Sequence, residues 1–473
     1  MTAFDWQRTR SQHVAAPAAS VWEVVSDLRR WPEWATSIGS VEAPERLEPG
    51  SSTRYLPSAR WAAELHGRTA PPLRVVEVEP GRRLAVEQPN PVGAMRVEWT
   101  VEPAGDAACT VTQRVACTGP LSPLVVRGVA GALARQWPES VTRLAALAGV
   151  RPSPDALRVV VAGGSGTLGR ALSADLASRG HEVVVLTRSP QPDLPHRQVA
   201  WDGETLGPWV EALNEEPGRT AVVNLAGRLV DVRPTAANVR DLRESRVRPT
   251  LALVEASRSL SSPLAAWVQG STTAIWSDAG EALVTESTPL PTGTDALPQM
   301  TGVARPWEDA ADGANTARLV LLRTSIVLQD GSPAFDRLAG LTRLGLGGRV
   351  GSGRQWFSWV HVDDWLAIVR SALGVDTGVN PGVDPAASLE GVVVAAAPEP
   401  VRNAELMAAL RRHLRRPASP PTPELLVRVG SVPLRTDPAL GLTGRHCTSE
   451  VLAASGFAFA HPGLDGALAD LLS

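Results

Sequence analysis

A glycine-rich turn between an apolar strand and a helix is the feature that most constrains this chain. The apolar run Leu157–Val161 leads to three glycines spaced three residues apart, Gly163, Gly166 and Gly169, and a helical pattern follows. A strand, such a loop and a helix together present backbone N–H groups and the positive end of a helix to a pyrophosphate. The sequence therefore predicts a Rossmann-type fold that binds a dinucleotide.

Residues around this loop are predicted to select and hold the cofactor. Arg188 follows the second strand, where the adenine ribose of a dinucleotide binds, and a cation there suits a 2′-phosphate. We therefore predict NADP(H), with NAD as the less favoured alternative, and expect Ser189 or Arg170 to assist Arg188. A loop that has lost its cofactor is the competing interpretation. The predicted cofactor-binding residues are Gly163, Ser165, Gly166, Thr167, Leu168, Gly169, Arg188, Leu225, Ala226 and Gly227.

The residues that usually transfer protons beside such a loop are missing. The chain has no lysine, and its only tyrosine, Tyr55, lies far upstream of the loop. A Tyr-x-x-x-Lys pair, in which the tyrosine is the general acid and base and the lysine lowers its pKa, therefore cannot exist. The sequence combines a dinucleotide loop with the loss of this pair.

Composition and periodicity divide the chain into four predicted segments. Residues 1–150 carry a helix, several strands and a closing helix, and residues 151–156 form a Pro-rich joint. Strands alternate with helices over 157–330, which predicts an α/β, doubly wound parallel sheet with helices on both faces. Residues 331–473 mix a Gly-rich loop with helices and are predicted to form a small C-terminal substrate region.

A hairpin has the clearest pattern within the first segment. Residues 95–102 alternate apolar and polar side chains with a period of two, and the turn at 103–106 leads to a return strand at 108–117. A long apolar helix is expected over 121–148, with a kink at Pro138.

The order of these elements, with AAPAASVWEVVSDLRRWPEW near the N-terminus, resembles the START-like superfamily that includes polyketide cyclases and lipid-transfer proteins. The resemblance spans residues 10–148. It implies an α+β helix-grip domain, a curved sheet around a helix, with a cavity for an apolar ligand. Tyr55, His66 and Arg68 are candidate polar residues of that cavity, and a structural or surface role is the alternative.

Seven later segments resemble a second family. They are GGSGTLGRAL, VVVLTRSP, VVNLAG, RESRVRPTLALVEA, LVLLRTSIVL, RLGLGGRVGSGRQWFSWVHVDDW and AAPEPVRNAEL, in this order over 157–472. Together they resemble the atypical extended short-chain dehydrogenases of the NAD-dependent epimerase/dehydratase family, nucleoside-diphosphate-sugar epimerase type. That family also lacks a regular Tyr-x-x-x-Lys pair. The resemblance implies a small-molecule substrate and places Ser271 at the position of the catalytic serine.

The chain departs from this family pattern where the substrate is expected. Ile275 and Trp276 replace two tyrosines that follow the fifth strand, and Arg228 stands where the family usually has glutamate. We expect Ser271 to hydrogen-bond a carbonyl oxygen, with water or Asp278 as the proton donor. The alternative is that Ser271 only satisfies the polar end of the strand.

Other polar motifs are interpreted as structural. His361 precedes two carboxylates, and we expect Asp363 or Asp364 to cap the helix that begins there. Trp307 and Glu308 are expected to pack and cap.

One loop and three cysteines complete the candidate groups. The loop Gly351–Gln355 is a candidate for binding a phosphate of substrate or cofactor, against a plain turn. No metal site is predicted, because Cys109, Cys117 and Cys447 lack the spacing of metal ligands. The first two share one face of a predicted strand, so we expect them to be buried.

The overall composition limits the classes of binding partner that we expect. The net charge of −3 gives no field that attracts nucleic acid or an anionic membrane. No signal pattern and no apolar run of membrane-spanning length is recognised, so a cytoplasmic protein without a membrane span is expected. The sequence does not define the oligomeric state.

Three hypotheses about function remain open. The first is an NADP(H)-dependent oxidoreductase or epimerase whose N-terminal domain captures an apolar molecule. The second is a catalytically silent sensor or scaffold that binds NADP(H) or a ligand. In the third, the START-like domain is itself a cyclase or dehydratase and the Rossmann part is accessory.

Overall fold

The structure is a computed structural model. It describes residues 6–59, 63–64, 71–90, 93–119, 135–152, 156–375 and 389–472.

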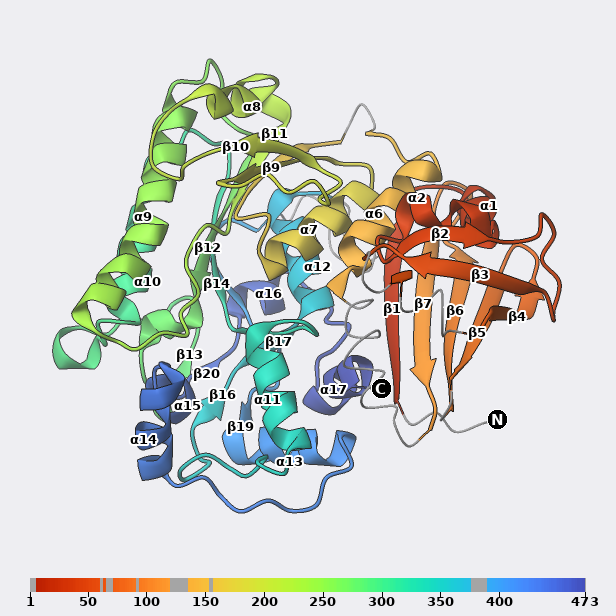
Figure 1. The fold of residues 1–473 in the computed structure, drawn as a ribbon. Helices are drawn as coiled ribbons and strands as arrows, with labels where there is room; N and C mark the ends of the chain where they lie inside the picture. Colours follow the sequence, from red (N-terminus) through yellow and green to blue (C-terminus); the bar gives the residue numbers. More distant parts are fainter. Residues whose placement is uncertain are drawn as a thin grey trace.

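The N-terminal segment forms a curved antiparallel sheet, drawn in red and orange in Figure 1, with helices packed against one face. The described strands follow the order β1-β7-β6-β5-β4-β3-β2. The expected hairpin is confirmed, since β6 pairs with β7 and their buried residues alternate. The elements are β1 (Trp6–Val14), α1 (Ala18–Ser26), α2 (Trp31–Trp34), β2 (Ile38–Glu42), β3 (Ser52–Pro57), β4 (Leu73–Glu79), β5 (Arg83–Asn90), β6 (Gly93–Pro103), β7 (Cys109–Cys117) and α6 (Trp137–Leu147).

Indole rings fill part of the space between this sheet and its helices. Trp34 of α2 lies edge-on to Trp99 of β6, with ring centroids 5.0 Å apart, and Trp99 stacks on Trp137 of α6 at 6.0 Å. All three side chains are buried. These contacts hold α6 against the concave face of the sheet, which is the helix-grip arrangement.

The closing helix α6 begins at Trp137, with Pro138 in its first turn, where a missing N–H costs nothing. The kink expected at Pro138 stays a prediction. The part of the expected helix at 121–134 lies outside the described residues. Cys109 and Cys117 are buried free thiols, as expected.

The second sheet is parallel, with the strand order β10-β9-β8-β11-β12-β14-β18. Strand residues alternate between two cores: those of one face pack with α7 and α12, and those of the other with α9. The predicted doubly wound Rossmann fold is confirmed (Figure 1). The elements are β8 (Arg158–Ala162), α7 (Thr167–Ser178), β9 (Glu182–Thr187), β10 (Arg197–Ala200), α8 (Glu211–Asn214), β11 (Thr220–Asn224), α9 (Ala236–Arg258), β12 (Ala266–Thr272), α10 (Thr301–Asp309), β14 (Leu319–Thr324), α12 (Val362–Leu373) and β18 (Gly391–Ala395).

The last part of the chain adds short strands and helices beside the parallel sheet. Its core is formed by α11, α13 and α17. No described helix is long and apolar enough to cross a membrane. The elements are β13 (Leu283–Val284), β15 (Ile326–Leu328), α11 (Pro333–Arg343), β16 (Trp356–Phe357), β17 (Trp359–His361), β19 (Val401–Arg402), α13 (Asn403–His413), α14 (Glu424–Leu434), α15 (Ala439–Leu442), β20 (His446–Cys447), α16 (Glu450–Ala454) and α17 (Leu464–Leu472).

The helix-grip part packs directly on the Rossmann part, with α6 beside α7 and β1 beside α17 (Figure 1). Glu139 of α6 accepts a hydrogen bond of 2.6 Å from Arg170 of α7. Arg8 and Arg10 of β1 both pair with Asp330, at 3.0 and 2.7 Å. The contact is therefore made by ion pairs as well as by helix packing.

A buried carboxylate joins three elements at this contact. Asp175 of α7 is 3% exposed and accepts hydrogen bonds from Arg370 of α12 at 2.5 Å, from Arg179 at 3.1 Å and from Gln12 of β1 at 3.2 Å. Burial opposes its ionisation, but the two arginines outweigh burial and hold the pKa of Asp175 far below its ordinary value. Asp175 therefore fixes α7 relative to both α12 and the N-terminal sheet.

Replacing this carboxylate with an amide should destabilise the protein strongly. Asp175→Asn leaves Arg370 and Arg179 buried without a counter-charge, and we expect the free energy of unfolding to fall by about 3–5 kcal/mol in denaturant titrations at pH 7. The folded-state pKa lies below the unfolded value of about 3.9. The contribution is therefore complete above that value and is lost as the pH falls through the folded-state pKa. Asp193→Asn, at an exposed carboxylate, is the matched control. Equal stability of Asp175→Asn and the control at pH 7 would contradict this account.

Candidate cofactor and active site

The glycine loop is shaped by backbone contacts that leave no room for side chains. Gly163 has a positive φ of 80°, and a Cβ built on it would lie 2.7 Å from the carbonyl oxygen of Leu225. A Cβ on Gly169 would lie 2.4 Å from the carbonyl oxygen of Gly163. The loop after β8 is thus pressed against the end of β11 on one side and against α7 on the other.

The start of α7 is open to an anion. Gly166 is the N-cap residue and supplies no side-chain acceptor for the first N–H groups of the helix. Those groups and the positive end of the helix dipole favour a phosphate. Gly166 and Thr167 are exposed, Ser165 is half-buried, and Leu168 packs on the core below. These predicted residues therefore surround the open helix end, with Leu168 in a packing role.

Arg188 stands just past the end of β9 and is exposed. It makes no hydrogen bond or ion pair with the described residues, so its guanidinium is available to a ligand. Arg170, which we expected to assist it, instead pairs with Glu139 of α6. Ser189 donates its backbone N–H to Thr187 at 3.3 Å, which shapes the turn that carries Arg188.

The turn after β11 is fixed by a buried amide. Asn224 is fully buried and donates to Thr250 at 2.9 Å and to Gln269 at 3.1 Å, while its oxygen accepts the N–H of Ala226 at 3.1 Å. These bonds hold Leu225, Ala226 and Gly227 against the glycine loop. The predicted cofactor residues after β8 and β11 are therefore brought together.

Ser271 lies at the end of β12 with its hydroxyl directed into the protein. It is 6% exposed and donates a hydrogen bond of 2.5 Å to Glu308 of α10. Glu308 also accepts two hydrogen bonds from Arg323 of β14, at 2.9 and 2.8 Å. Glu308 therefore does not cap its helix but pairs with a buried arginine. Sequence reasoning missed Arg323, although an arginine inside the apolar run LVLLRT was an available signal.

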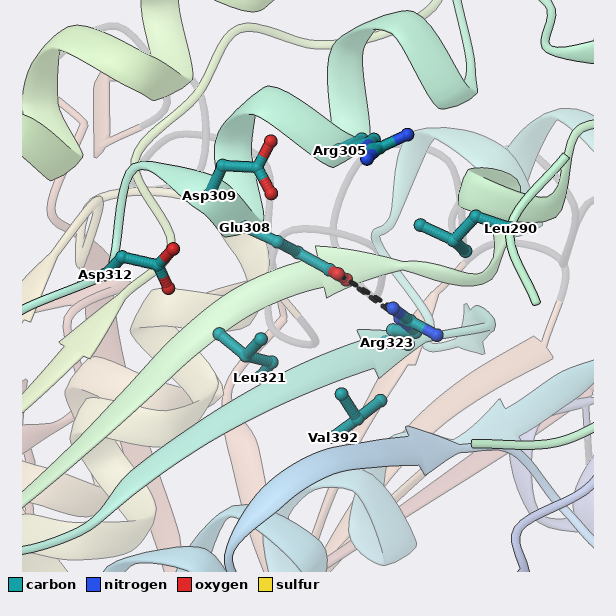
Figure 2. A pocket seen from close by; sticks show the side chains of 8 residues that line it. All are labelled: Leu290, Arg305, Glu308, Asp309, Asp312, Leu321, Arg323 and Val392. Carbon is teal, nitrogen blue, oxygen red and sulfur yellow. Dashed lines mark hydrogen bonds and ion pairs between the residues drawn. The ribbon is translucent and has the colours of Figure 1, made fainter. Parts of the chain in front are cut away.

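A pocket of about 440 Å³ opens over this ion pair (Figure 2). The Glu308–Arg323 pair lies in its middle, with Arg305, Asp309 and Asp312 around it. Burial raises the pKa of Asp309 and outweighs the opposing effect of Arg305, and repulsion from Asp312 and Glu308 adds to the increase. The lining residues are Leu290, Arg305, Glu308, Asp309, Asp312, Leu321, Arg323 and Val392.

The cap of α12 differs from the expectation. His361 Nδ1 accepts the N–H of Asp363 at 3.2 Å, so the histidine is the capping residue. Asp364 instead accepts the N–H groups of Ala460 and His461. His361 caps the helix because β17 ends at this residue and the fold buries its ring beside the first N–H groups of α12.

The same histidine lies in a cluster that the sequence did not predict. One imidazole nitrogen from each of His361 and His461 and one carboxylate oxygen from each of Asp363 and Asp470 lie within 4.8 Å of one another. Nε2 of His361 is 3.3 Å from Asp470 Oδ2, and His461 lies 3.8 Å from Asp363. Hydrogen bonding to Asp363 raises the pKa of His461. Paired histidines and carboxylates of this kind balance one another's charge.

The other predicted polar groups are placed as follows. Gln355 donates to the carbonyl oxygens of Val350 and Gly441, so the Gly351–Gln355 loop is a tied turn, with Arg354 exposed. In the N-terminal sheet, Tyr55 donates to Gln88, and burial raises its pKa to about 12, which disfavours acid–base work near neutral pH. His66 and Arg68 lie outside the described residues.

The loop, the open helix end and the strand order define a dinucleotide-binding Rossmann protein with a helix-grip domain before it. Two protein families match accordingly. The family described as "Polyketide cyclase / dehydrase and lipid transport" matches residues 5–149, and the "NAD dependent epimerase/dehydratase family" matches residues 159–295. Epimerase family protein SDR39U1 of Bos taurus is 32% identical over 324 residues, which cover 67% of this chain and 100% of that relative. The chain belongs to this epimerase family.

Further relatives and solved structures agree. Epimerase family protein MT2273 of Mycobacterium tuberculosis is 31% identical over 314 residues, covering 66% of this chain and 96% of the relative. The crystal structure of human SDR39U1 with NADPH has a TM-score of 0.55 and 29% identity over 67% of this chain and 99% of that one. A nucleoside-diphosphate sugar epimerase from Corynebacterium glutamicum has a TM-score of 0.57 and 22% identity, and covers 98% of this chain and 90% of that one. That likeness shows the fold of both parts together.

Enlarging a loop glycine should abolish binding of a dinucleotide. Gly169→Ala places a methyl group 2.4 Å from the carbonyl oxygen of Gly163, so the loop must move away from the pyrophosphate position. We expect at least a tenfold loss of NADPH affinity in a fluorescence titration. Gly218→Ala, where nothing lies within 4 Å, is the matched control and should bind as the unmodified protein does. Unchanged binding by Gly169→Ala would disprove the assignment of the loop.

Proposed function

We propose that this protein is an NADP(H)-dependent oxidoreductase or epimerase acting on a small molecule. One observation carries the proposal: the helix end behind the glycine loop has no side-chain cap, and Arg188, which follows the neighbouring strand β9, is exposed and makes no ion pair with the described residues. A cation at the end of the second strand complements the 2′-phosphate that distinguishes NADP from NAD. The NADPH bound to the human relative supports the same choice.

Residues of this chain would position the substrate beside the nicotinamide. Bound NADPH supplies a hydride. Ser271 is proposed as the hydroxyl that holds a carbonyl oxygen. In the structure its one proton is donated to Glu308, so binding a carbonyl requires the hydroxyl to rotate away from Glu308. Asp278 is exposed, accepts the N–H of Gly444 at 3.2 Å and stands after the same strand as a candidate proton donor. Without a tyrosine and lysine pair, catalysis would depend mainly on proximity and orientation.

The N-terminal domain is proposed to bind an apolar ligand and present it to the Rossmann domain. Its core is packed with indole rings and aliphatic side chains, and α6, which contributes to that core, packs on α7. We also propose that residues 151–156 are the boundary between the N-terminal domain and the Rossmann domain.

A catalytically silent NADP(H) sensor is the second candidate. The observation that favours it is the commitment of the Ser271 hydroxyl to a buried ion pair, which leaves it 6% exposed. Turnover separates the two candidates, because a sensor binds the cofactor without oxidising it.

Reversing the charge of Arg188 should change cofactor preference. Arg188→Glu places a carboxylate beside the 2′-phosphate, and we expect at least a tenfold loss of NADPH affinity with NADH affinity unchanged or higher, measured by nicotinamide fluorescence. Arg54→Glu, at an exposed position of β3, controls for the change in net charge. Equal loss of both nucleotides would argue against a role at the 2′-phosphate.

Removing the hydroxyl of Ser271 should slow turnover but not cofactor binding. Acid–base and hydrogen-bond assistance at a reacting oxygen is worth about 10²–10⁴-fold. For Ser271→Ala we expect NADPH oxidation, measured across a panel of carbonyl compounds, to fall by at least tenfold with NADPH affinity preserved. Ser371→Ala removes another buried hydroxyl, one that bonds only a helix carbonyl, and should not alter the rate. Turnover that survives Ser271→Ala would exclude the serine, and no turnover by the unmodified protein would favour the sensor.

A further inference from the structure

Arg246 of α9 lies directly behind the turn that follows β11. A Cβ built on the exposed Gly227 would lie 3.1 Å from the Arg246 guanidinium carbon. The guanidinium donates to the carbonyl oxygens of Leu242 at 3.0 Å and Arg228 at 2.9 Å. The Leu225–Gly227 turn therefore contacts the glycine loop on one side and the Arg246 guanidinium on the other.

No carboxylate among the residues that the structure describes compensates this charge. In the described ranges Arg246 forms no ion pair, and burial alone lowers the pKa of its guanidinium to about 10. By contrast, the buried arginines Arg323 and Arg370 face carboxylates at 2.8 and 2.5 Å. Arg246 is half-buried, and its guanidinium is held by two carbonyl oxygens, the Ser245 hydroxyl at 3.5 Å and the face of the Trp307 ring. A partly desolvated cation without a carboxylate partner retains a demand for an anion, because desolvating an unpaired charge is costly.

An unsatisfied N–H lies beside the same cation. Trp307 of α10 is 8% exposed, and the Arg246 guanidinium carbon lies 5.1 Å from the centre of its ring. Its indole Nε1 has no hydrogen-bond partner in the part of the chain that the structure describes. Buried donors are rarely left unpaired, so this N–H marks a place for an acceptor.

Both donors lie near the carboxyl ends of β11 and β12. Cζ2 of Trp307, adjacent to the ring carbon that carries Nε1, lies 3.2 Å from a Cβ built on Gly270. Gly227 follows β11, Gly270 lies near the end of β12, and α9 and α10 pack side by side over this edge (Figure 1). Ligands of parallel α/β sheets bind at this edge.

We propose that Arg246 and the indole N–H of Trp307 bind a carboxylate of the substrate, so that the substrate class is a carbonyl or hydroxy compound bearing a carboxylate. A planar guanidinium and one further N–H match the two oxygens of a carboxylate, whose geometry the arginine fork fits. Arg246 is a substrate-binding residue in this proposal, which rests on the proposed NADP(H)-dependent function.

Oxalate is a suitable probe, because it carries the carboxylate and lacks any reducible group. We expect it to quench or shift the fluorescence of the NADPH-loaded protein, and its affinity to fall at least tenfold in Arg246→Gln while NADPH affinity is unchanged. Arg246→Lys keeps the charge and should retain part of the affinity. Arg258→Gln, on the same helix and also bonded to backbone carbonyls, is the matched control.

A second variant guards against loss of folding. Trp307→Phe keeps an aromatic ring under Arg246 but removes the N–H, and we expect about tenfold weaker oxalate binding with an unchanged thermal midpoint. Absence of oxalate binding to the unmodified protein, equal binding by Arg246→Gln, or equal competition by inorganic phosphate would overturn the carboxylate site. Failure of the unmodified protein to bind NADPH would overturn the proposed function instead, and oxalate titration followed by indole fluorescence without cofactor would still decide the role of Arg246.

Discussion

The buried carboxylate of Asp175 is the interaction on which the arrangement of the whole chain depends. It belongs to α7, whose other end forms the glycine loop, and it holds Arg370 of α12 and Gln12 of the first strand. A carboxylate buried between two arginines is stable only in one geometry, because any displacement leaves charge without a partner. The position of the cofactor helix is thereby set by contacts with both halves of the protein.

The cofactor site is correspondingly built from backbone rather than from side chains. Contacts between Gly163 and Leu225, and between Gly169 and Gly163, allow the loop to reach a pyrophosphate closely. Arg170, four residues past the N-cap Gly166, binds Glu139 of the helix-grip domain. One helix thus carries the proposed phosphate-binding end, a contact with the helix-grip domain and the buried carboxylate.

Local patterns predicted most of the fold, and long-range pairing of charges explains the differences. The strands expected to alternate with helices over 157–330 form the parallel sheet, and the period-two hairpin forms β6 and β7. These follow from periodicity within one element. The Glu308–Arg323 pair unites distant residues whose charges suggest a surface, and periodicity carries no sign of it. His361 likewise became a cap because the tertiary fold buries its ring, which propensity for aspartate at such positions could not anticipate.

The ion pairs between the two domains have a consequence for how such a protein can arise. Glu139 faces Arg170, while Arg8 and Arg10 face Asp330. The two domains therefore carry complementary charges at their contact. Were the two halves produced as separate polypeptides, their complementary faces would guide them into the same register. Fusion into one chain therefore adds a high local concentration to an interface that already specifies its partner.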